Sequence, residues 1–388
     1  MGNKFEIPLG KERGLISELR KREDNESKRL IRFLDLPDLS RTSGSPLEAM
    51  VEAVKSIPAL KDFDDIKIPE VVPTNVTFDM FGFSKDHPAR SKSDTYYVDE
   101  EHILRTHDTV MWYYYLNLPE IKERIKKEEP LGVICYGKVY RKDEIDRTHM
   151  NVFHQMGGLY LIPDKKGKLE FEDLKNVLTE ITTTIFGKDI NYRFSEETFP
   201  YTDPSIEVEI LKESAQAGGE AKWVEILGSG MPKKEILKNF GLEGYNGWAF
   251  GFGLERLAMI SMDLPDIRLL WSDDERVKKQ LKLGQKFEEV SKYPPVVRDI
   301  SFVVSKNSFV LNDYFDMIRE TGGDVIEEVE LLDKYEDEKK FGEDKLSYTF
   351  RITYRHLEKT LTNGEVNELH KKIEEKTVSE FSGVLRLD

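Results

Sequence analysis

Two segments of the sequence each place one arginine among aromatic and glycine residues. In the first, Arg141 comes directly after an apolar, strand-like run, and Phe153 follows twelve residues later in a second such run. This pattern predicts a strand, a loop and a strand, with a guanidinium that can hold a phosphate beside a ring on which adenine can stack. In the second, the glycine-rich residues 247–253 lead into an apolar helix at 254–260 that carries Arg256. The free N–H groups and the dipole at a helix start favour anions, so the two arginines together suit a triphosphate.

Together the two segments resemble motifs 2 and 3 of the class II aminoacyl-tRNA synthetases, in which the arginines hold the α- and γ-phosphates of ATP. Six further strings follow one another in the order of the phenylalanyl-tRNA synthetases. They are His87-Pro-Ala-Arg90, Asp94-Thr-Tyr-Tyr97, Leu104-Arg-Thr-His107, Phe153-His-Gln155, Phe199-Pro-Tyr-Thr202 and Trp223-Val-Glu-Ile-Leu-Gly228. From Ser291 onward the chain resembles the ferredoxin-fold anticodon-binding domain of the single-chain, mitochondrial or other organellar type. The resemblance covers about residues 70 to 388.

The resemblance implies that the protein activates phenylalanine with ATP and Mg²⁺ and transfers it to the 3′-terminal ribose of tRNA(Phe). Arg141 and Arg256 are then the expected catalytic residues, with Arg141 on the α-phosphate and Arg256 on the γ-phosphate. Phe153 is expected to stack on adenine, and Glu225 is the expected magnesium ligand. Three further residues are expected to contact ATP, namely Asp143, His149 and Met150.

The resemblance also implies a pocket for the amino acid. Its expected residues are His107, Thr109, Trp112, Gln155, Phe199, Tyr201, Ala249 and Phe250. The small side chain of Ala249 leaves room for the far edge of a phenylalanine ring. Trp112 stands where many relatives have glutamine, and the sequence does not decide whether it forms the pocket wall or the core.

Two positions of the pocket depart from the family pattern. Gly157 stands where relatives usually carry an acid that pairs with the substrate ammonium, so either another acid replaces it or substrate binding is weak. Tyr201 stands where relatives commonly have phenylalanine. A buried hydroxyl without a partner costs about 1–3 kcal/mol, so the Tyr201 hydroxyl needs a partner either in the protein or on a substrate such as tyrosine.

These departures leave two alternatives open. Beside a phenylalanine--tRNA ligase, the protein could be an impaired synthetase paralogue that binds tRNA or aminoacyl-adenylate, or a ligase for a related aromatic amino acid. The presence of both arginines together with Phe153, Gln155 and an anticodon-type domain argues against an impaired paralogue.

Length and periodicity predict an α+β protein with more than one domain, because 388 residues are too many for one compact core. We expect a helical extension at 1–45 and a class II catalytic domain at 46–275, built on an antiparallel sheet with flanking helices. A linker at 276–290 and a ferredoxin-like domain at 291–388 follow. Within these domains we expect helices at 15–34, 47–56 and 169–186 and a strand at 96–104.

The last hundred or so residues alternate in the βαββαβ order of a ferredoxin-like fold. Thr362 and Glu365 predict a capping box at the start of its second helix, which we expect at 363–376. A final strand is expected at 384–387.

The net charge of −15 argues against unspecific binding of nucleic acid, because such binding depends on many lysines and arginines. A tRNA must therefore meet local basic patches, for which residues 20–32, 122–127 and 351–359 are candidates. No apolar run reaches the length of about 18 residues that a membrane helix needs. The single cysteine, Cys135, excludes an intramolecular disulfide.

Assembly and location follow from the resemblance and from what the sequence lacks. We see no features of a partner subunit, so a monomer is expected. The acidic residue near the start, Glu6, is unlike the acid-poor transit peptides, so no targeting peptide is visible. We expect a cytoplasmic protein in a prokaryote and a protein of the mitochondrial matrix or another organelle in a eukaryote.

Overall fold

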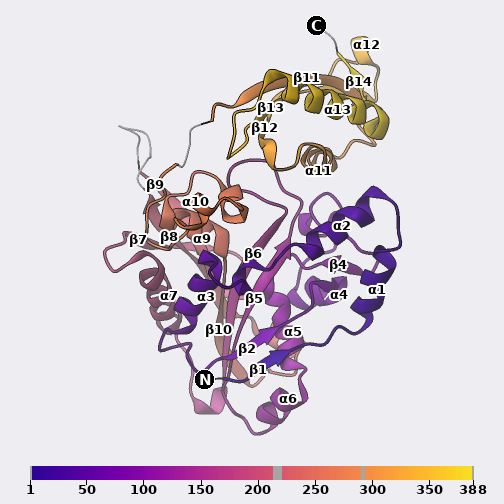
Figure 1. Cartoon of the computed structure of the whole chain (residues 1–388). Helices are drawn as coiled ribbons and strands as arrows, with labels where there is room; N and C mark the ends of the chain where they lie inside the picture. The colour runs from indigo at the N-terminus through magenta and orange to yellow at the C-terminus, as the bar shows by residue number, and fades with distance from the viewer. Residues whose placement is uncertain (1, 213–220, 290–292, 387–388) are drawn as a thin grey trace.

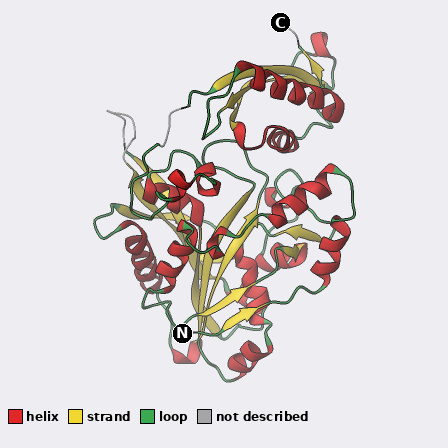
Figure 2. Ribbon diagram, viewed as in Figure 1, coloured by secondary structure: helices red, strands yellow, loops and turns green. Residues whose placement is uncertain are grey.

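The computed structural model of this protein describes residues 2–212, 221–289 and 293–386. A large sheet runs through the lower part of the molecule with helices around it, and a smaller sheet with its own helices lies above (Figures 1 and 2). Among the described residues, no helix is long and apolar enough to cross a membrane.

The large sheet has eight strands. In spatial order they are β1 (Lys4–Glu6), β2 (Asp64–Lys67), β5 (Leu131–Tyr140), β6 (Val152–Pro163), β10 (Tyr245–Gly253), β9 (Lys222–Pro232), β8 (Thr202–Lys212) and β7 (Tyr192–Glu197). The strands from β5 to β7 pair antiparallel, as predicted. At the other edge β1 and β2 add two parallel pairings that the sequence did not predict. The N-terminal segment thus contributes a strand to this sheet.

Ten helices accompany the large sheet in the described residues. They are α1 (Lys11–Leu19), α2 (Asn25–Asp35), α3 (Pro46–Lys55), α4 (Thr74–Thr77), α5 (Met111–Leu116), α6 (Pro119–Lys126), α7 (Phe171–Phe186), α8 (Lys234–Lys238), α9 (Leu254–Met262) and α10 (Glu275–Lys278). A two-stranded sheet of β3 (Val71–Pro73) and β4 (His102–Leu104) lies beside them.

Two predicted elements are wrong in extent. The helix predicted at 15–34 is two helices, because the Asp24 side chain accepts the Ser27 N–H and starts α2 as a new helix. The strand predicted at 96–104 is reduced to β4. The Asp99 side chain accepts the backbone N–H groups of Glu101 and His102, each at 2.8 Å, and this turns the chain before β4.

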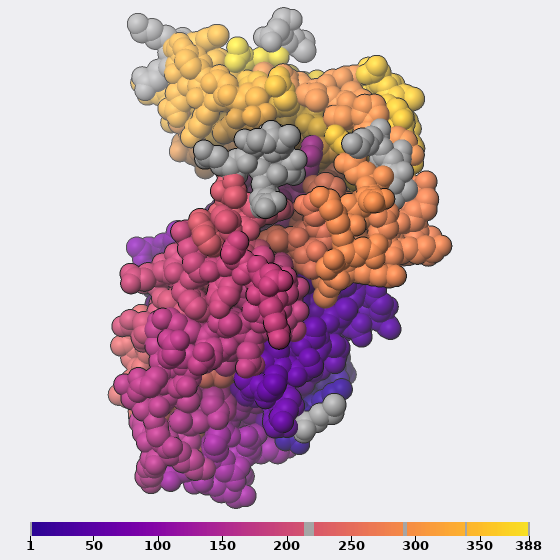
Figure 3. Space-filling view, turned by 90° about the vertical axis from the view of Figure 1, so that its left-hand side faces the viewer, coloured from indigo at the N-terminus to yellow at the C-terminus, as the bar shows by residue number. Residues whose placement is uncertain are grey.

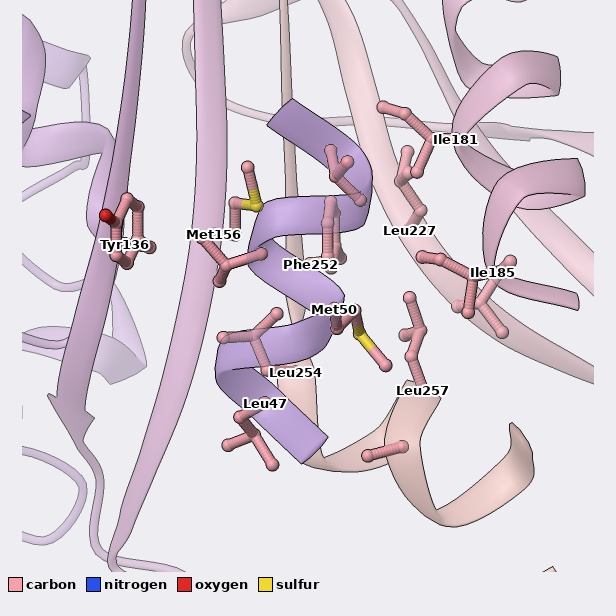
Figure 4. Close-up of a cluster of buried hydrophobic side chains, with 14 of the residues drawn as sticks. Leu47, Met50, Tyr136, Met156, Ile181, Ile185, Leu227, Phe252, Leu254 and Leu257 are labelled. Carbon is pink, nitrogen blue, oxygen red and sulfur yellow. The ribbon is translucent and has the colours of Figure 1, made fainter. Parts of the chain in front are cut away.

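Helix α3 anchors the core beneath the site. Ser45 caps it and Pro46 takes its first position, one residue before the start predicted at 47. Leu47, Met50, Val51 and Val54 repeat at helical spacing and are fully buried. Figure 4 shows Leu47 and Met50 among Phe252 of β10, Leu254 and Leu257 of α9, and Ile181 and Ile185 of α7. This packing fixes the position of the junction between β10 and α9.

The smaller sheet has the order β12-β13-β11-β14, which is the ferredoxin-like arrangement predicted for this part of the chain. Its elements are β11 (Val296–Ser305), α11 (Leu311–Gly322), β12 (Ile326–Tyr335), α12 (Glu338–Phe341), β13 (Lys345–Tyr354), α13 (Asn363–Phe381) and β14 (Val384–Leu385). The capping box of Thr362 and Glu365 is confirmed. The strand predicted at 384–387 is observed over Val384–Leu385, and residue 387 lies outside the described residues.

The smaller domain rests on the loop between β5 and β6. Ile145 of this loop is buried in the hydrophobic core of the smaller domain, and the Val329 N–H donates to the Ile145 carbonyl at 3.0 Å. Arg319 of α11 donates to the backbone carbonyls of Asp143 and Glu144 in the same loop. In Figure 3 the orange and yellow part of the chain covers the top of the large domain. The loop is therefore held from both domains.

A second contact joins the domains through a buried carboxylate. Asp316 of α11 accepts the Tyr96 hydroxyl at 2.8 Å and the Asn151 amide at 2.9 Å, and it pairs with Arg29 of α2 at 3.1 Å. Because Asp316 is 2% exposed, these partners compensate for the cost of burying its charge. The N-terminal segment thus also contacts the smaller domain.

Candidate active site

Strands β5 and β6 place the first arginine. Arg141 follows the last residue of β5, and its guanidinium carbon lies 5.3 Å from the centre of the Phe153 ring in β6. Its Nε donates to the Thr106 carbonyl at 3.0 Å, which fixes the direction of the side chain. Desolvation by nearby protein atoms lowers the pKa of the guanidinium, although Arg141 is an exposed residue, and Asp143 and Asp108 attract it only from a distance. A cation held in this way is suited to receive an anionic ligand.

The junction between β10 and α9 places the second arginine. Arg256 is the third residue of α9, directly after the glycine-rich strand, as predicted. Its Nη1 lies 3.2 Å from Oε2 of Glu225 in β9, and both side chains are about half exposed. An exposed pair of this kind is weak, so a phosphate group can compete for Arg256.

All fifteen residues that the sequence predicts for the site line one cavity of about 440 Å³. They are His107, Thr109, Trp112, Arg141, Asp143, His149, Met150, Phe153, Gln155, Phe199, Tyr201, Glu225, Ala249, Phe250 and Arg256. A space of this size is typical of a small-molecule site. The segments come from distant parts of the chain, and the sheet brings them together.

Aromatic rings line part of the cavity. Tyr201 stacks on Phe199 with ring centres 6.0 Å apart, and Trp112 meets Tyr201 edge to face at 6.2 Å. Trp112 is 1% exposed, so it belongs to the core and also lines the cavity. Ala249 lies in the same hydrophobic cluster. Edge and face contacts of this kind suit a flat apolar ring.

The Tyr201 hydroxyl has a polar neighbour within the protein. Burial raises its pKa, whereas the Thr109 side chain lowers it. Thr109 is therefore the side chain that the protein offers to this hydroxyl.

Comparison with protein families identifies the architecture. The model of the class II core domain of tRNA synthetases, subgroup F, matches residues 34–281. The model of the ferredoxin-fold anticodon-binding domain matches residues 291–386. The chain belongs to the class II tRNA synthetases.

Individual relatives of this synthetase are similar over most of its length. The mitochondrial phenylalanine--tRNA ligase of Mus musculus is 36% identical over 348 residues, which cover 80% of this chain and 73% of the relative. The chloroplastic/mitochondrial phenylalanine--tRNA ligase of Arabidopsis thaliana is 38% identical, with 84% and 72% covered. The phenylalanine--tRNA ligase alpha subunit of Persephonella marina is 36% identical, with 72% and 78% covered.

Sequence reasoning missed a buried acid of the synthetase that lies between two predicted residues. Asp108 is 5% exposed and lines the cavity between His107 and Thr109. Burial raises its pKa to about 7, and burial lowers the pKa of His107 to about 3. The sequence feature that could have revealed Asp108 is the glycine at position 157. Because the usual acid is missing there, another carboxylate was to be expected nearby.

Sequence reasoning also missed a buried pair that links the two arginine motifs. His154 of β6 lies with its Nδ1 2.6 Å from Oε1 of Glu255, the residue before Arg256. Its Nε2 accepts the Leu39 N–H at 2.9 Å, so the proton of the neutral ring lies on Nδ1 and points at Glu255. The Glu255 carboxylate also accepts the His154 backbone N–H at 2.8 Å. This pair fixes β6 and α9 relative to each other.

A neighbouring acid orients the loop histidine of the synthetase. Asp146 Oδ2 lies 2.7 Å from Nδ1 of His149, and this hydrogen bond raises the pKa of His149. The pKa of Asp146 is lowered to about 2, although burial alone would raise it. His149 is half-buried at the cavity wall and also feels the charges of Asp143 and Arg256. Its place fits a contact with ATP.

The residues at the Arg256 end fit a magnesium ion only in part. Among the described residues, no group of three or more histidine, cysteine or acidic side chains could hold a metal by itself. Mg²⁺ commonly binds one or two carboxylates together with the phosphates of its substrate. Glu225 lies beside Arg256 in the cavity, and Glu207 nearby has a pKa raised to about 7 by burial and by the charge of Glu225. This donor set suits a metal that arrives with a nucleotide.

Proposed function

We propose that this protein is an ATP-dependent phenylalanine--tRNA ligase. The observation that carries the proposal is that one cavity is lined both by Arg141 and Arg256 and by the aromatic group of Phe199 and Tyr201 together with Ala249. The names of the relatives support the choice of amino acid.

The first step joins the amino acid to AMP. A carboxylate oxygen of phenylalanine attacks the α-phosphorus of ATP, the bond to the β-phosphate breaks, and pyrophosphate leaves. Arg141 neutralises the charge that develops between carboxylate and α-phosphate, and Arg256 holds the γ-phosphate of the leaving group. Fixed cations of this kind need little reorganisation during the reaction and supply most of the rate.

The remaining groups position the nucleotide. Adenine stacks on Phe153, whose other contact is the guanidinium of Arg141. Asp143, His149 and Met150 line the same end of the cavity and contact the adenosine. Glu225 is the residue that would hold Mg²⁺, which supplies further charge neutralisation on the phosphates.

The second step transfers the aminoacyl group to tRNA. The 2′-hydroxyl of the terminal ribose attacks the carbonyl carbon of the adenylate, and AMP leaves with the electron pair of the broken bond. The ferredoxin-fold domain at 291–386 is the proposed contact for the anticodon. The protein acts as a monomer in this proposal, in the cytoplasm of a prokaryote or in an organelle of a eukaryote.

ATP–pyrophosphate exchange with each of the twenty amino acids tests the proposal. We expect exchange with phenylalanine, weak exchange with tyrosine and none above background with the others. Charging of a tRNA(Phe) transcript by the same preparation tests the second step. Exchange with another amino acid as the best substrate would contradict the proposal, and binding of ATP and tRNA without any exchange would favour an impaired paralogue.

A further inference from the structure

Asp108 is a buried carboxylate that the mechanism above does not use. It begins a short 3-10 helix over Asp108–Val110, and its backbone N–H donates to the Gln155 side chain at 3.1 Å. Its Oδ2 is buried and makes no hydrogen bond with any residue that the structure describes. An acceptor left in this state is costly unless a ligand supplies the missing donor.

Two paired glycines create the space in which this carboxylate lies. Gly157 of β6 and Gly251 of β10 are cross-strand partners. A Cβ atom on Gly157 would lie 2.0 Å from Oδ2 of Asp108, and one on Gly251 would lie 3.4 Å from Oδ1. Any side chain at position 157 would therefore collide with the carboxylate. Gly157 stands on β6 where relatives usually carry an acid. Because it has no side chain, it leaves the space that the Asp108 carboxylate occupies from the 3-10 helix.

The other carboxylates of the cavity are engaged elsewhere. Glu225 pairs with Arg256, and Glu255 pairs with His154. Asp143 accepts the Glu144 N–H in the loop at the nucleotide end. Of the carboxylates that line the cavity in the described part of the chain, Asp108 is the one close enough for its charge to act on the Tyr201 hydroxyl.

The positive charges near Asp108 do not pair with it directly. Arg105 donates through its Nε to the Lys138 carbonyl at 2.7 Å, and Arg141 donates to the Thr106 carbonyl. Both attract Asp108 only from a distance, so the carboxylate keeps a lone-pair site for a cation that comes from the cavity.

We propose that the Asp108 carboxylate binds the α-ammonium group of the amino acid substrate. The proposal rests on the proposed function, because a free amino acid brings a cation that must be neutralised when its side chain enters an apolar pocket. The ring then lies toward Tyr201 and Ala249, and the substrate carboxylate lies toward Arg141. Asp108 replaces the acid that relatives usually carry at the position of Gly157. It selects amino acids over carboxylic acids that lack the amino group.

Binding of two ligands separates this role from a structural one. Asp108→Asn keeps the shape of the side chain and removes its charge. We expect the Kd for phenylalanine to rise about tenfold to a hundredfold, the range for one charge-assisted hydrogen bond. The Kd for 3-phenylpropanoate, which has no amino group, should stay within about twofold, as should the KM for ATP in the exchange assay. Asp164→Asn, an exposed acid paired with Lys234, is the matched control and should change neither ligand.

A relocated carboxylate provides a second test. Asp108→Ala opens the space above Gly157, and Gly157→Asp then places an acid in it from β6. The double variant should recover at least about tenfold of the affinity for phenylalanine that Asp108→Ala loses. Circular dichroism checks that each variant is folded.

The outcomes distinguish the inference from the function on which it rests. Absence of phenylalanine-dependent exchange in the wild-type protein would overturn both. Wild-type exchange together with an unchanged Kd for phenylalanine in Asp108→Asn would overturn the inference alone. An equal loss of affinity for phenylalanine and 3-phenylpropanoate would also overturn it, because it would show a damaged pocket rather than a lost ammonium contact.

Discussion

Nδ1 of His154 lies 2.6 Å from Oε1 of Glu255, in a buried pair that joins the strand of the adenine platform to the helix of the second arginine. Glu255→Ala would leave two donors without an acceptor, the His154 ring and its backbone N–H. We expect the free energy of unfolding to fall by about 2–4 kcal/mol, measured by urea denaturation. Glu18→Gln, which weakens an exposed pair with Lys21, should leave it unchanged within the error of the measurement. An equal effect of both variants would show that the buried pair does not hold the two elements.

Removal of either cavity arginine should abolish most of the activity. Arg141→Ala and Arg256→Ala should each lower the rate of adenylate formation about a hundredfold to a thousandfold, because each removes one fixed cation from the phosphates. Pyrophosphate exchange measures this rate. Arg193→Ala, which removes an exposed arginine paired with Glu209, is the control and should stay near wild type. Exchange within about threefold of wild type in either cavity variant would refute the assigned roles.

Loss of one methyl group at Ala249 should widen the pocket. We expect Ala249→Gly to accept para-chlorophenylalanine, with discrimination lowered by about 1–3 kcal/mol, while phenylalanine is still activated. Exchange assays with both amino acids give the ratio of kcat/KM. Ala258→Gly, which removes a buried methyl group from α9, should lower stability without changing this ratio. An unchanged ratio in Ala249→Gly would place the ring elsewhere.

The affinity for phenylalanine should depend on pH through Asp108. Because burial raises the pKa of this acid to about 7, its charged form is scarce below that pH and dominant above it. We expect the KM for phenylalanine to fall about tenfold between about pH 6 and about pH 8, and we expect no such fall in Asp108→Asn. The free energy of unfolding should depend on pH in the opposite direction. Burial favours the protonated form of Asp108, so the contribution of this form to stability is lost as the pH rises through about 7.

Groups around Asp108 do not titrate in this range. Arg141 stays charged, and burial keeps His107, Tyr201 and Cys135 neutral. Glu207, whose pKa is also about 7, lies outside the cavity lining, so Glu207→Gln is the control and should keep the pH dependence. A dependence that survives in Asp108→Asn would assign the titration to another group.

The contact between α11 and the β5–β6 loop should affect nucleotide binding. Arg319→Ala removes the donors to the carbonyls of Asp143 and Glu144, so the loop that carries ATP contacts should loosen. We expect the KM for ATP to rise about threefold to tenfold with little change in the KM for phenylalanine. Arg351→Ala, which breaks an exposed pair with Asp299 inside the smaller domain, should leave both constants within about twofold. Equal changes in both KM values would point to general destabilisation.

The sequence by itself determined the features that depend on neighbours along the chain. Arg141 directly follows β5 and Phe153 lies on the adjacent strand β6, joined to it by one loop, so their spacing predicts their contact. The Ser45 cap and the capping box of Thr362 depend on hydrogen bonds within a few residues. The family resemblance added the residues of the pocket, all of which line the cavity.

Only the tertiary structure decided the features that depend on distant segments. The collision between Asp108 and any side chain at Gly157, the pair of His154 with Glu255 and the contact of Arg319 with the loop all join parts far apart in the sequence. The break between α1 and α2 was missed because residues 20–29 are all polar, so no apolar pattern marks where the first helix ends and the second begins. The periodicity of apolar residues predicts which face of a helix or strand is buried. Which distant residues pack against that face depends on the packing of the whole sheet.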